Sequence, residues 1–335
     1  MNQERRTFLI QPLIYGLGEH SQSPQTPYND IVKNLVLTPN TYGDGIGVFG
    51  EYSGVGRPTA QIQENLIDAN HTDGEGGGIG AVLARPTPTA DTVQDNTITS
   101  NTAARGGGGI YLESCTLVPI HRNRIHNNVA SALSSLSGGM HTWNSTPQLY
   151  CNNLTHNTAP ATGTALAIDG AAAAGPPFMA IYNNTFAENI ATGPDPATVD
   201  WWFATPMIDF TNNIFADNTG QIAVREPFGD SPQTFINNVF WNNPGGDVED
   251  YALGLLTAAQ VNAQPWGSGN LAADPMLDAT YHIPPSSPAR NAGINLALLG
   301  ITWDIDNETR PKDAGFDIGA DEVEIPLTVK DWRLH

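Results

Sequence analysis

Basic residues are scarce in this sequence. Only 14 lysines and arginines stand against 34 aspartates and glutamates in 335 residues, so the formal net charge is −20. Binding to phosphate backbones or to anionic headgroups needs clustered positive charge. The composition therefore argues against nucleic acid and anionic membranes as partners. An acidic polysaccharide would need cations such as calcium between the two surfaces.

Cysteines and long apolar runs are also few. Cys115 and Cys151 fall at different phases of the chain's repeat, so we expect buried free thiols and not a disulfide. No apolar run reaches the length that spans a bilayer, so we expect no membrane insertion. Near the start, Gln11 and Pro12 interrupt the apolar residues 8–10 before a signal-peptide core develops. We expect a first strand there, and further sequence upstream in the natural gene.

The most regular feature is a six-residue motif that recurs along the chain. It consists of an Asn, an apolar residue two places later and a second Asn three places after that. The first Asn recurs at steps of 25 to 32 residues, with a degenerate copy at Asn34 and full copies at Asn65, Asn96, Asn123, Asn152, Asn184, Asn213 and Asn238. A period of this length is typical of solenoid proteins.

Each position of the motif has a structural interpretation. The apolar positions, Val36, Ile67, Ile98, Ile125, Leu154, Phe186, Phe215 and Phe240, predict an interior column that changes from aliphatic to aromatic. Side-chain amides both donate and accept, so stacked Asn residues predict hydrogen-bonded ladders. Asn also tolerates the left-handed backbone that a tight corner needs.

A second block follows each early motif, with a Gly turn leading into a short strand of period two. Ile110, Leu112, Met140 and Thr142 take the inward positions of two such strands. The alternate positions then face outward and form rows on the surface of the stack.

These patterns predict an all-β fold, a single-domain right-handed parallel β-helix of about eight coils with a C-terminal cap. The predicted divisions are an N-terminal strand or cap region over 1–30, the coils over 31–265 and a capping segment over 266–335. We expect Trp303, Phe316 and Ile318 to pack on the column that ends in Phe240. An antiparallel sandwich is the alternative, but it gives no reason for a six-residue motif at this period.

The repeat resembles the right-handed parallel β-helix family typified by pectate lyases and many bacterial surface proteins. Towards the C-terminus, Gly269 to Pro275, Ser287 to Gly293 and Asp317 to Glu322 resemble the closing segment of choice-of-anchor Q β-helix proteins. The resemblance implies a secreted or cell-surface solenoid. Only residues 323–335 follow the resembling segment, which is too short for an anchor.

One outward row combines groups suited to a sugar ligand. Tyr111 and Glu113 lie on one predicted coil, and His141 and Trp143 lie on the next. Aromatic faces stack on sugar rings, while a carboxylate and an imidazole bond hydroxyls or transfer protons. We predict that these four residues form one solvent-facing strip, which Asp169 and then Asp209 extend. The alternative is a mixed surface row without function.

Catalysis and metal binding remain open at this level. Glu113 with Asp169 is a candidate acid and base pair for glycoside cleavage, with His141 as a further candidate catalytic residue. The chain shows no signature of pectate lyases, polygalacturonases or pectin methylesterases. Asp304, Asp306 and Glu308 alternate as in a calcium loop, although the Gly of an EF-hand is missing.

The sequence therefore favours a secreted or surface β-helix that binds a polysaccharide or other glycan through Tyr111 and Trp143 without transforming it. A polysaccharide lyase or glycoside hydrolase acting in the same groove is the alternative. A structural or adhesin stalk is the third class.

Overall fold

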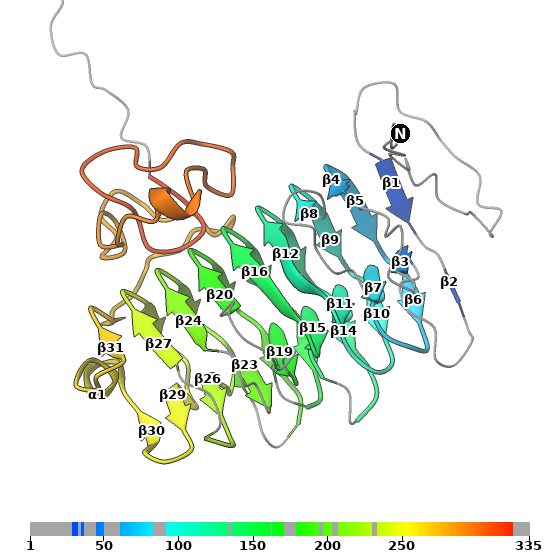
Figure 1. Cartoon of the computed structure of the whole chain (residues 1–335), viewed down its shortest axis with the longest axis horizontal. Coiled ribbons are helices and arrows are strands. Elements are labelled where there is room, and N and C mark those ends of the chain that lie inside the picture. The colour runs from blue at the N-terminus through cyan, green and yellow to red at the C-terminus, as the bar shows by residue number, and fades with distance from the viewer. Residues whose placement is uncertain are drawn as a thin grey trace, which may run out of the picture.

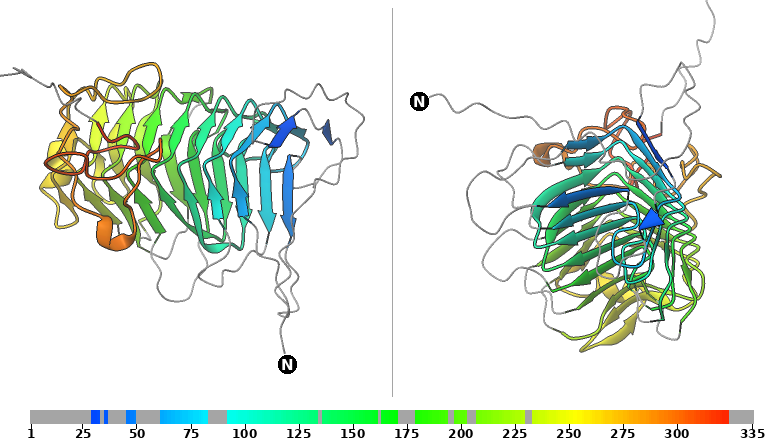
Figure 2. Two further views of the ribbon diagram at one scale, coloured as in Figure 1. Left: turned by 90° about the horizontal axis from the view of Figure 1, so that it is seen from above. Right: turned by 90° about the vertical axis from the view of Figure 1, so that its right-hand side faces the viewer.

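The solenoid is built from four sheets that run side by side along its axis. The computed structural model describes residues 29–32, 35–36, 45–49, 61–82, 92–133, 136–161, 163–170, 179–193, 197–202, 207–229 and 233–323. The first strand expected before residue 29 lies outside these residues. Strands of successive coils stack directly above one another in the described part of the chain (Figures 1 and 2). The all-β parallel solenoid is thereby confirmed.

Sheets 1 and 2 carry the Asn motif and the short strand after it. Sheet 1 consists of β1 (Asn29–Val32), β5 (Asn65–Asp68), β9 (Thr97–Thr99), β13 (Arg124–His126), β17 (Asn153–Thr155), β21 (Thr185–Ala187), β25 (Ile214–Ala216), β28 (Val239–Trp241) and β32 (Leu271–Ala272). Sheet 2 consists of β2 (Leu35–Val36), β6 (His71–Thr72), β10 (Thr102–Ala103), β14 (Val129–Ala130), β18 (Thr158–Ala159) and β22 (Ile190–Ala191).

Sheets 3 and 4 complete each coil. Sheet 3 consists of β3 (Ile46–Phe49), β7 (Ile79–Val82), β11 (Ile110–Glu113), β15 (Met140–Trp143), β19 (Leu166–Asp169), β23 (Ala197–Trp202), β26 (Ile222–Glu226), β29 (Gly246–Asp250) and β30 (Gly254–Leu256), the last of which pairs antiparallel with β29. Sheet 4 consists of β4 (Gln61–Gln63), β8 (Thr92–Gln94), β12 (Thr116–His121), β16 (Thr146–Tyr150), β20 (Met179–Tyr182), β24 (Ile208–Thr211), β27 (Gln233–Ile236) and β31 (Gly267–Ser268).

As far as the chain is described, six turns carry a strand in every sheet, and two later turns lack the strand of sheet 2. This count is close to the predicted eight coils. The described residues contain two short helices, α1 (Ala258–Asn262) between β30 and β31 and the 3-10 helix η1 (Ala297–Leu299) after β32. No helix in the described part of the chain is long and apolar enough to cross a membrane.

Both Asn ladders are present and unbroken through the described coils. In the first ladder, Asn123 Nδ2 donates to Asn152 Oδ1 at 3.0 Å, and the backbone N–H of Asn123 donates to the same oxygen at 3.0 Å. Asn152 Nδ2 also donates inward to the carbonyl of Ile120 at 2.8 Å. The first ladder extends one step further than predicted, to Asn270. These bonds satisfy polar groups that would otherwise be buried without partners.

The left-handed residue at each corner is the one before the ladder Asn, and not the ladder Asn itself. Arg122, Cys151 and Asn183 precede Asn ladder positions and have φ of 54°, 56° and 51°. Non-Gly residues seldom adopt this region. The ladder bonds on the next residue hold the backbone through each corner, so residue types with little left-handed preference are tolerated there.

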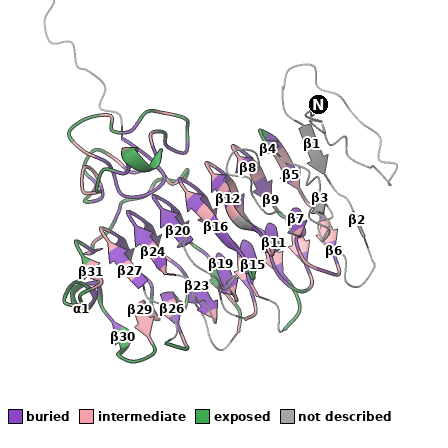
Figure 3. Ribbon diagram, in the orientation of Figure 1, coloured by how far each residue is buried: buried purple, intermediate pink, exposed green. Residues whose placement is uncertain are grey.

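The interior column is confirmed from Ile67 onward. Ile98, Ile125 and Leu154 stand in register on adjacent strands and are fully buried. Further along, the rings of Phe186 and Phe215 stack with centroids 4.9 Å apart. Figure 3 shows the buried residues running along the stacked strands.

The position assigned to the first copy of the motif is wrong. Val36 lies in β2 opposite Thr72 in sheet 2, whereas Ile31 lies opposite Ile67 in sheet 1. The copy that matches is therefore Asn29, Ile31 and Asn34, so Asn34 is its closing Asn. Asn34 and Val36 have the spacing of the first two motif positions, but Pro39 stands where the closing Asn belongs.

The expected contacts of the C-terminal residues are also wrong. The interior column is closed by Ala258 and Val261 of α1 together with Trp266. Residues 273–323, here called the lateral segment, instead lie along the side of the last coils (Figure 1).

The lateral segment packs through two separate apolar clusters. Ile318 packs with Ile214 and Val239 of sheet 1, and Phe316 packs with Ala180 and Tyr182 of sheet 4. Trp303 is 44% exposed. Asn183 donates side-chain hydrogen bonds to the carbonyls of residues 317 and 319. The corner between sheets 4 and 1 thus provides both apolar and polar docking points, because the corner Asn side chains project outward.

We predict that Ile125→Asp abolishes cooperative folding. Ile125 is fully buried between Ile98 and Leu154, so the variant buries an unpaired carboxylate, at a cost that rivals the whole stability of a domain. Ile125→Val is the matched control and should cost about 0.5–1.5 kcal/mol. Thermal unfolding followed by circular dichroism measures both. A cooperative transition of Ile125→Asp near that of the parent would contradict the column.

Candidate functional site

The predicted phase of β11 and β15 is confirmed. Ile110, Leu112, Met140 and Thr142 point inward and are buried. The alternate residues stand side by side in sheet 3, with Tyr111 opposite His141 and Glu113 opposite Trp143. Two stacked coils therefore contribute two residues each to the predicted strip.

Solvent exposure divides this strip into two rows. Trp143 is 48% exposed and Glu113 is half-buried, but Tyr111 and His141 are only 3% and 4% exposed. The prediction that all four face solvent is therefore wrong for Tyr111 and His141. The Gly106 backbone lies against the His141 ring, since a Cβ on Gly106 would sit 2.8 Å from Nδ1. The Tyr111 ring meets the imidazole edge-on, with centroids 5.2 Å apart.

Tyr111 and His141 form a buried row beneath the surface. The Tyr111 hydroxyl donates to Glu113 Oε2 at 3.3 Å. Burial raises the pKa of Glu75, and a hydrogen bond from Tyr111 partly offsets this rise. Within the described residues neither ring nitrogen of His141 has a hydrogen-bond partner. Burial lowers the pKa of His141 to about 4, so the ring is neutral at pH 7. His141 thus supports the strip from below and does not face a ligand in solution.

The other row, which is exposed at Trp143 and half-buried elsewhere, continues over four coils. Trp143 lies opposite Asp169 on β19, and Asp169 lies opposite Trp202 on β23. Glu113, Trp143, Asp169 and Trp202 therefore form one line, here called the edge row, in which carboxylates alternate with indoles. Successive members are one strand spacing apart, about 4.8 Å along the axis. Burial raises the pKa of the half-buried Asp169.

A buried ion pair holds the far end of the edge row. Asp200 is 1% exposed and accepts from Arg225 through Nε at 3.2 Å and Nη2 at 3.0 Å. The same carboxylate accepts from Trp202 Nε1 at 2.7 Å. Trp202 also meets Phe228 edge-on, with centroids 6.0 Å apart. The indole of Trp202 is thereby fixed in orientation.

Asp209 does not extend this strip. It lies on β24 in sheet 4, where its carboxylate accepts from the hydroxyls of Tyr182, Thr211 and Thr234 at 2.7, 2.8 and 2.7 Å. The register of the later coils could not be fixed from the sequence, because turn lengths vary there. Asp200 and Trp202, which the sequence analysis missed, occupy the sheet 3 positions instead. The inward alternation of Val199 and Trp201 is the signal that identifies them.

The structure does not bring Asp304, Asp306 and Glu308 together as a calcium loop. Asp304 Oδ1 accepts from the backbone N–H groups of residues 306 and 308, at 3.0 and 2.7 Å. Glu308 pairs with Lys312, and Asp306 faces Arg124 and His282. Asp304 is therefore a turn-stabilising residue, and the alternation of carboxylates reflects the shape of the turn.

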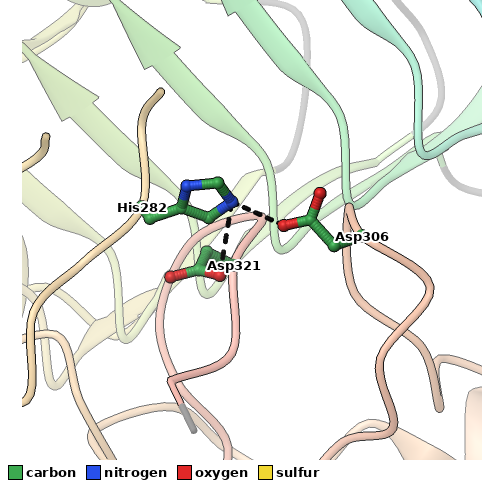
Figure 4. A group of neighbouring side chains, drawn as sticks. All are labelled: His282, Asp306 and Asp321. Atoms are coloured by element: carbon green, nitrogen blue, oxygen red, sulfur yellow. Dashed lines mark hydrogen bonds and ion pairs between the residues drawn. The ribbon is translucent and has the colours of Figure 1, made fainter. Parts of the chain in front are cut away.

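Asp306 belongs to a different group, the His282 cluster, made of His282, Asp306 and Asp321 (Figure 4). One ligand atom from each side chain lies within 4.8 Å of the other two. His282 Nε2 is 2.5 Å from Asp306 Oδ2 and 3.9 Å from Asp321 Oδ1. The hydrogen bond with Asp306 raises the pKa of His282 to about 9, and burial raises that of Asp321 to about 6.

No spacing motif in the sequence could have identified the His282 cluster. Its members lie on three separate loops of the lateral segment and meet only when that segment folds back on itself. The cysteines behave as expected, since Cys115 and Cys151 are both buried and free.

We predict that the neutral state of His141 makes folding weaker in acid. In the folded protein the pKa of His141 is about 4, below the ordinary 6.5. The contribution of neutral His141 to the free energy of unfolding is therefore fully present above pH 6.5 and is lost as the pH falls towards 4. At pH 5 the loss should reach about 2 kcal/mol. His141→Gln should reduce the drop in unfolding free energy between pH 7 and 5 by this amount, whereas Met140→Leu should leave the drop unchanged. Denaturant titrations at the two pH values measure the difference, and equal drops in parent and His141→Gln would contradict it.

Comparison with known proteins identifies the family. The model of the periplasmic copper-binding protein (NosD) family matches residues 23–206, which is more than half of the chain. The chain therefore belongs to this family of right-handed β-helix proteins. The match ends before the lateral segment, so the resemblance of that segment to choice-of-anchor Q proteins stays a prediction. No curated protein and no solved structure matched the chain.

Proposed function

We propose that this member of the NosD family acts outside the cytoplasm and binds a neutral glycan along the edge row of sheet 3. The periplasmic description of the family supports the location. The observation that carries the ligand class is the alternation of indoles, one exposed and one half-buried, with carboxylates at one-coil intervals. Indole faces stack on the apolar faces of sugar rings, and carboxylates accept hydrogen bonds from hydroxyls.

The dimensions of the edge row suit a chain of sugars better than a single one. Trp143 and Trp202 are two coils apart, about 10 Å along the axis, with Asp169 between them. Two indoles at this separation would stack on sugar rings that are not adjacent in the polysaccharide. Trp202 is held by Asp200 before any ligand arrives, which lowers the entropy that binding must overcome.

Charge favours neutral over acidic glycans. Glu113 and Asp169 belong to the edge row itself, and the chain as a whole carries a formal charge of −20. A uronate polymer would meet both repulsions unless cations intervened. The proposed ligand is therefore a neutral polysaccharide rich in free hydroxyls.

A glycoside hydrolase of the inverting class is the second candidate, and Asp169 favours it. Burial raises the pKa of Asp169, as general acids require. Glu113 lies two strands away, about 10 Å at the backbone, just above the roughly 6.5–9.5 Å that separates the carboxyl groups of inverting enzymes. In this alternative Asp169 protonates the leaving oxygen and Glu113 activates water.

Metal binding is a further part of the proposal, because the family description names copper. A soft Cu(I) site does not fit the two cysteines. Cys115 Sγ donates to the carbonyls of Ala81 and Glu113, and burial raises the pKa of the Cys151 thiol to about 11. The imidazole and carboxylates of the His282 cluster fit a divalent ion.

We predict that Trp143→Ala combined with Trp202→Ala weakens binding to neutral glycans at least tenfold, or about 1.4 kcal/mol, because both stacking platforms are lost. Trp241→Ala is the matched control, since Trp241 is 38% exposed on sheet 1 and lies outside the edge row. Glycan arrays and calorimetry with neutral and acidic oligosaccharides measure the effect. Unchanged affinity in the double variant would remove the edge row as the site.

We predict that reducing-end release, if the parent shows it, depends on Asp169 and Glu113. Asp169→Asn and Glu113→Gln should each lower the rate by at least a hundredfold, because proton transfer contributes about 10²–10⁴-fold. Glycan affinity should fall far less than the rate, because each amide keeps one acceptor oxygen for sugar hydroxyls. Binding without product in the parent would leave the glycan-binding proposal standing and remove the hydrolase.

A further inference from the structure

We propose that His282 Nε2, Asp306 Oδ2 and Asp321 Oδ1 form a binding site for one divalent transition-metal ion, Cu²⁺ or Zn²⁺. The three atoms already converge without a metal, all within 4.8 Å of one another. The inference rests on the metal-binding part of the proposed function, and it is independent of the edge row. It also lies outside residues 23–206, the part of the chain that the family model covers.

Each of the three side chains is oriented by a second partner that leaves one atom for the ion. Asp306 uses Oδ1 to accept from Arg124 and presents Oδ2. Asp321 uses Oδ2 to accept from the backbone N–H of Ile283 at 2.9 Å and presents Oδ1. Outer partners of this kind fix metal ligands in place and are a regular part of metal sites.

The orientation of the imidazole is set by a hydrogen-bond chain. The Thr280 hydroxyl donates to Asp278 Oδ1 at 2.7 Å, so towards His282 it can only accept. His282 Nδ1 lies 2.6 Å from that hydroxyl and therefore carries a proton. The lone pair of the neutral ring is then on Nε2, the atom that faces both cluster carboxylates. Metal binding by a histidine is favoured when its other ring nitrogen is linked by hydrogen bonds to a carboxylate. Here Asp278 is linked to Nδ1 through the Thr280 hydroxyl.

The point where the three atoms meet is held by a proton in the free protein. Nε2 and Asp306 Oδ2 face each other in a hydrogen bond, so a proton lies between them. A metal ion replaces that proton and also reaches Asp321 Oδ1, which stands 3.9 Å from Nε2 and makes no close bond with it.

The donor set selects the class of ion. One imidazole nitrogen with two carboxylate oxygens suits Cu²⁺ and Zn²⁺, whereas calcium takes six to eight oxygen ligands. Tetrahedral ligands about 2.0–2.1 Å from Zn²⁺ lie about 3.3 Å apart. The observed separations of 2.5 and 3.9 Å fall on either side of that value, so small side-chain movements suffice. Water completes the coordination.

Binding at this point has a structural consequence. The three ligands come from separate loops of the lateral segment, and Arg124 on β13 connects Asp306 to the coils. An ion shared by all three loops therefore holds the lateral segment closed and docked. We expect Cu²⁺ or Zn²⁺ to raise the melting temperature of the full chain, because a ligand that binds only the folded state stabilises it.

The test uses the full chain without a histidine tag, freed of metal with a chelator. Calorimetry with Cu²⁺, Zn²⁺ and Ca²⁺ should show one site for each of the first two ions and none for Ca²⁺. His282→Gln and Asp321→Asn should each weaken binding at least tenfold and remove the rise in melting temperature. Asp321→Asn retains an oxygen for the Ile283 N–H, so it separates loss of a ligand from loss of the fold.

His71→Gln is the matched control for adventitious binding, because His71 is an exposed histidine on β6, distant in the chain from the cluster. It should keep the parent's affinity. The electron paramagnetic resonance spectrum of the Cu²⁺ form should show coupling to imidazole nitrogen that His282→Gln abolishes. Single-site binding that survives both cluster variants would overturn this site but not metal binding by the chain. No single-site binding in the parent would overturn both, and neither result bears on glycan binding.

Discussion

The stacked asparagines are the constraint on which the rest of the solenoid depends. Each ladder Asn accepts two bonds from the coil before it and donates to the coil after it and to an interior carbonyl. A buried corner would otherwise leave polar groups without partners, at a cost of about 1–3 kcal/mol each. The ladders also hold the left-handed residues that turn the chain. Because the same bonds recur at every coil, the motif strands of sheet 1 and the strands β7 to β23 of sheet 3 stay in register from coil to coil.

Constant register converts local sequence patterns into surface rows. A residue facing outward on one strand of sheet 3 lies beside the outward residue of the next coil, about 4.8 Å away. Glu113, Trp143, Asp169 and Trp202 become neighbours in this way although 89 residues separate the first from the last. The fold therefore supplies a regular platform for a repeating ligand, and the side chains on one row decide which ligand fits.

The lateral segment is not part of the coils but packs against their outer side. It packs on the outer corner of sheets 4 and 1 through two apolar clusters, and it is tied down by the outward corner residues Asn183, Asn212 and Asn237. The family match ends at residue 206, so it covers neither the last coils nor this segment. The proposed metal site on the lateral segment therefore lies outside the part of the chain that the family model matches. Its ligands meet at one point because the segment folds over itself, and Arg124 links that point to the coils.

The sequence by itself determined the solenoid, both ladders, the interior column and the inward phase of β11 and β15, because each depends on short-range spacing that recurs at every coil. It could not determine that Tyr111 and His141 are covered, since burial of an outward residue depends on what packs over it. Asp209 was placed on the wrong sheet because variable turn lengths hide the register of later coils. The position of Phe316 and Ile318 and the meeting of His282 with Asp306 and Asp321 were decided by tertiary structure alone. The loops of this segment have no repeat in the sequence. Their contacts form only when their apolar side chains pack on the coils.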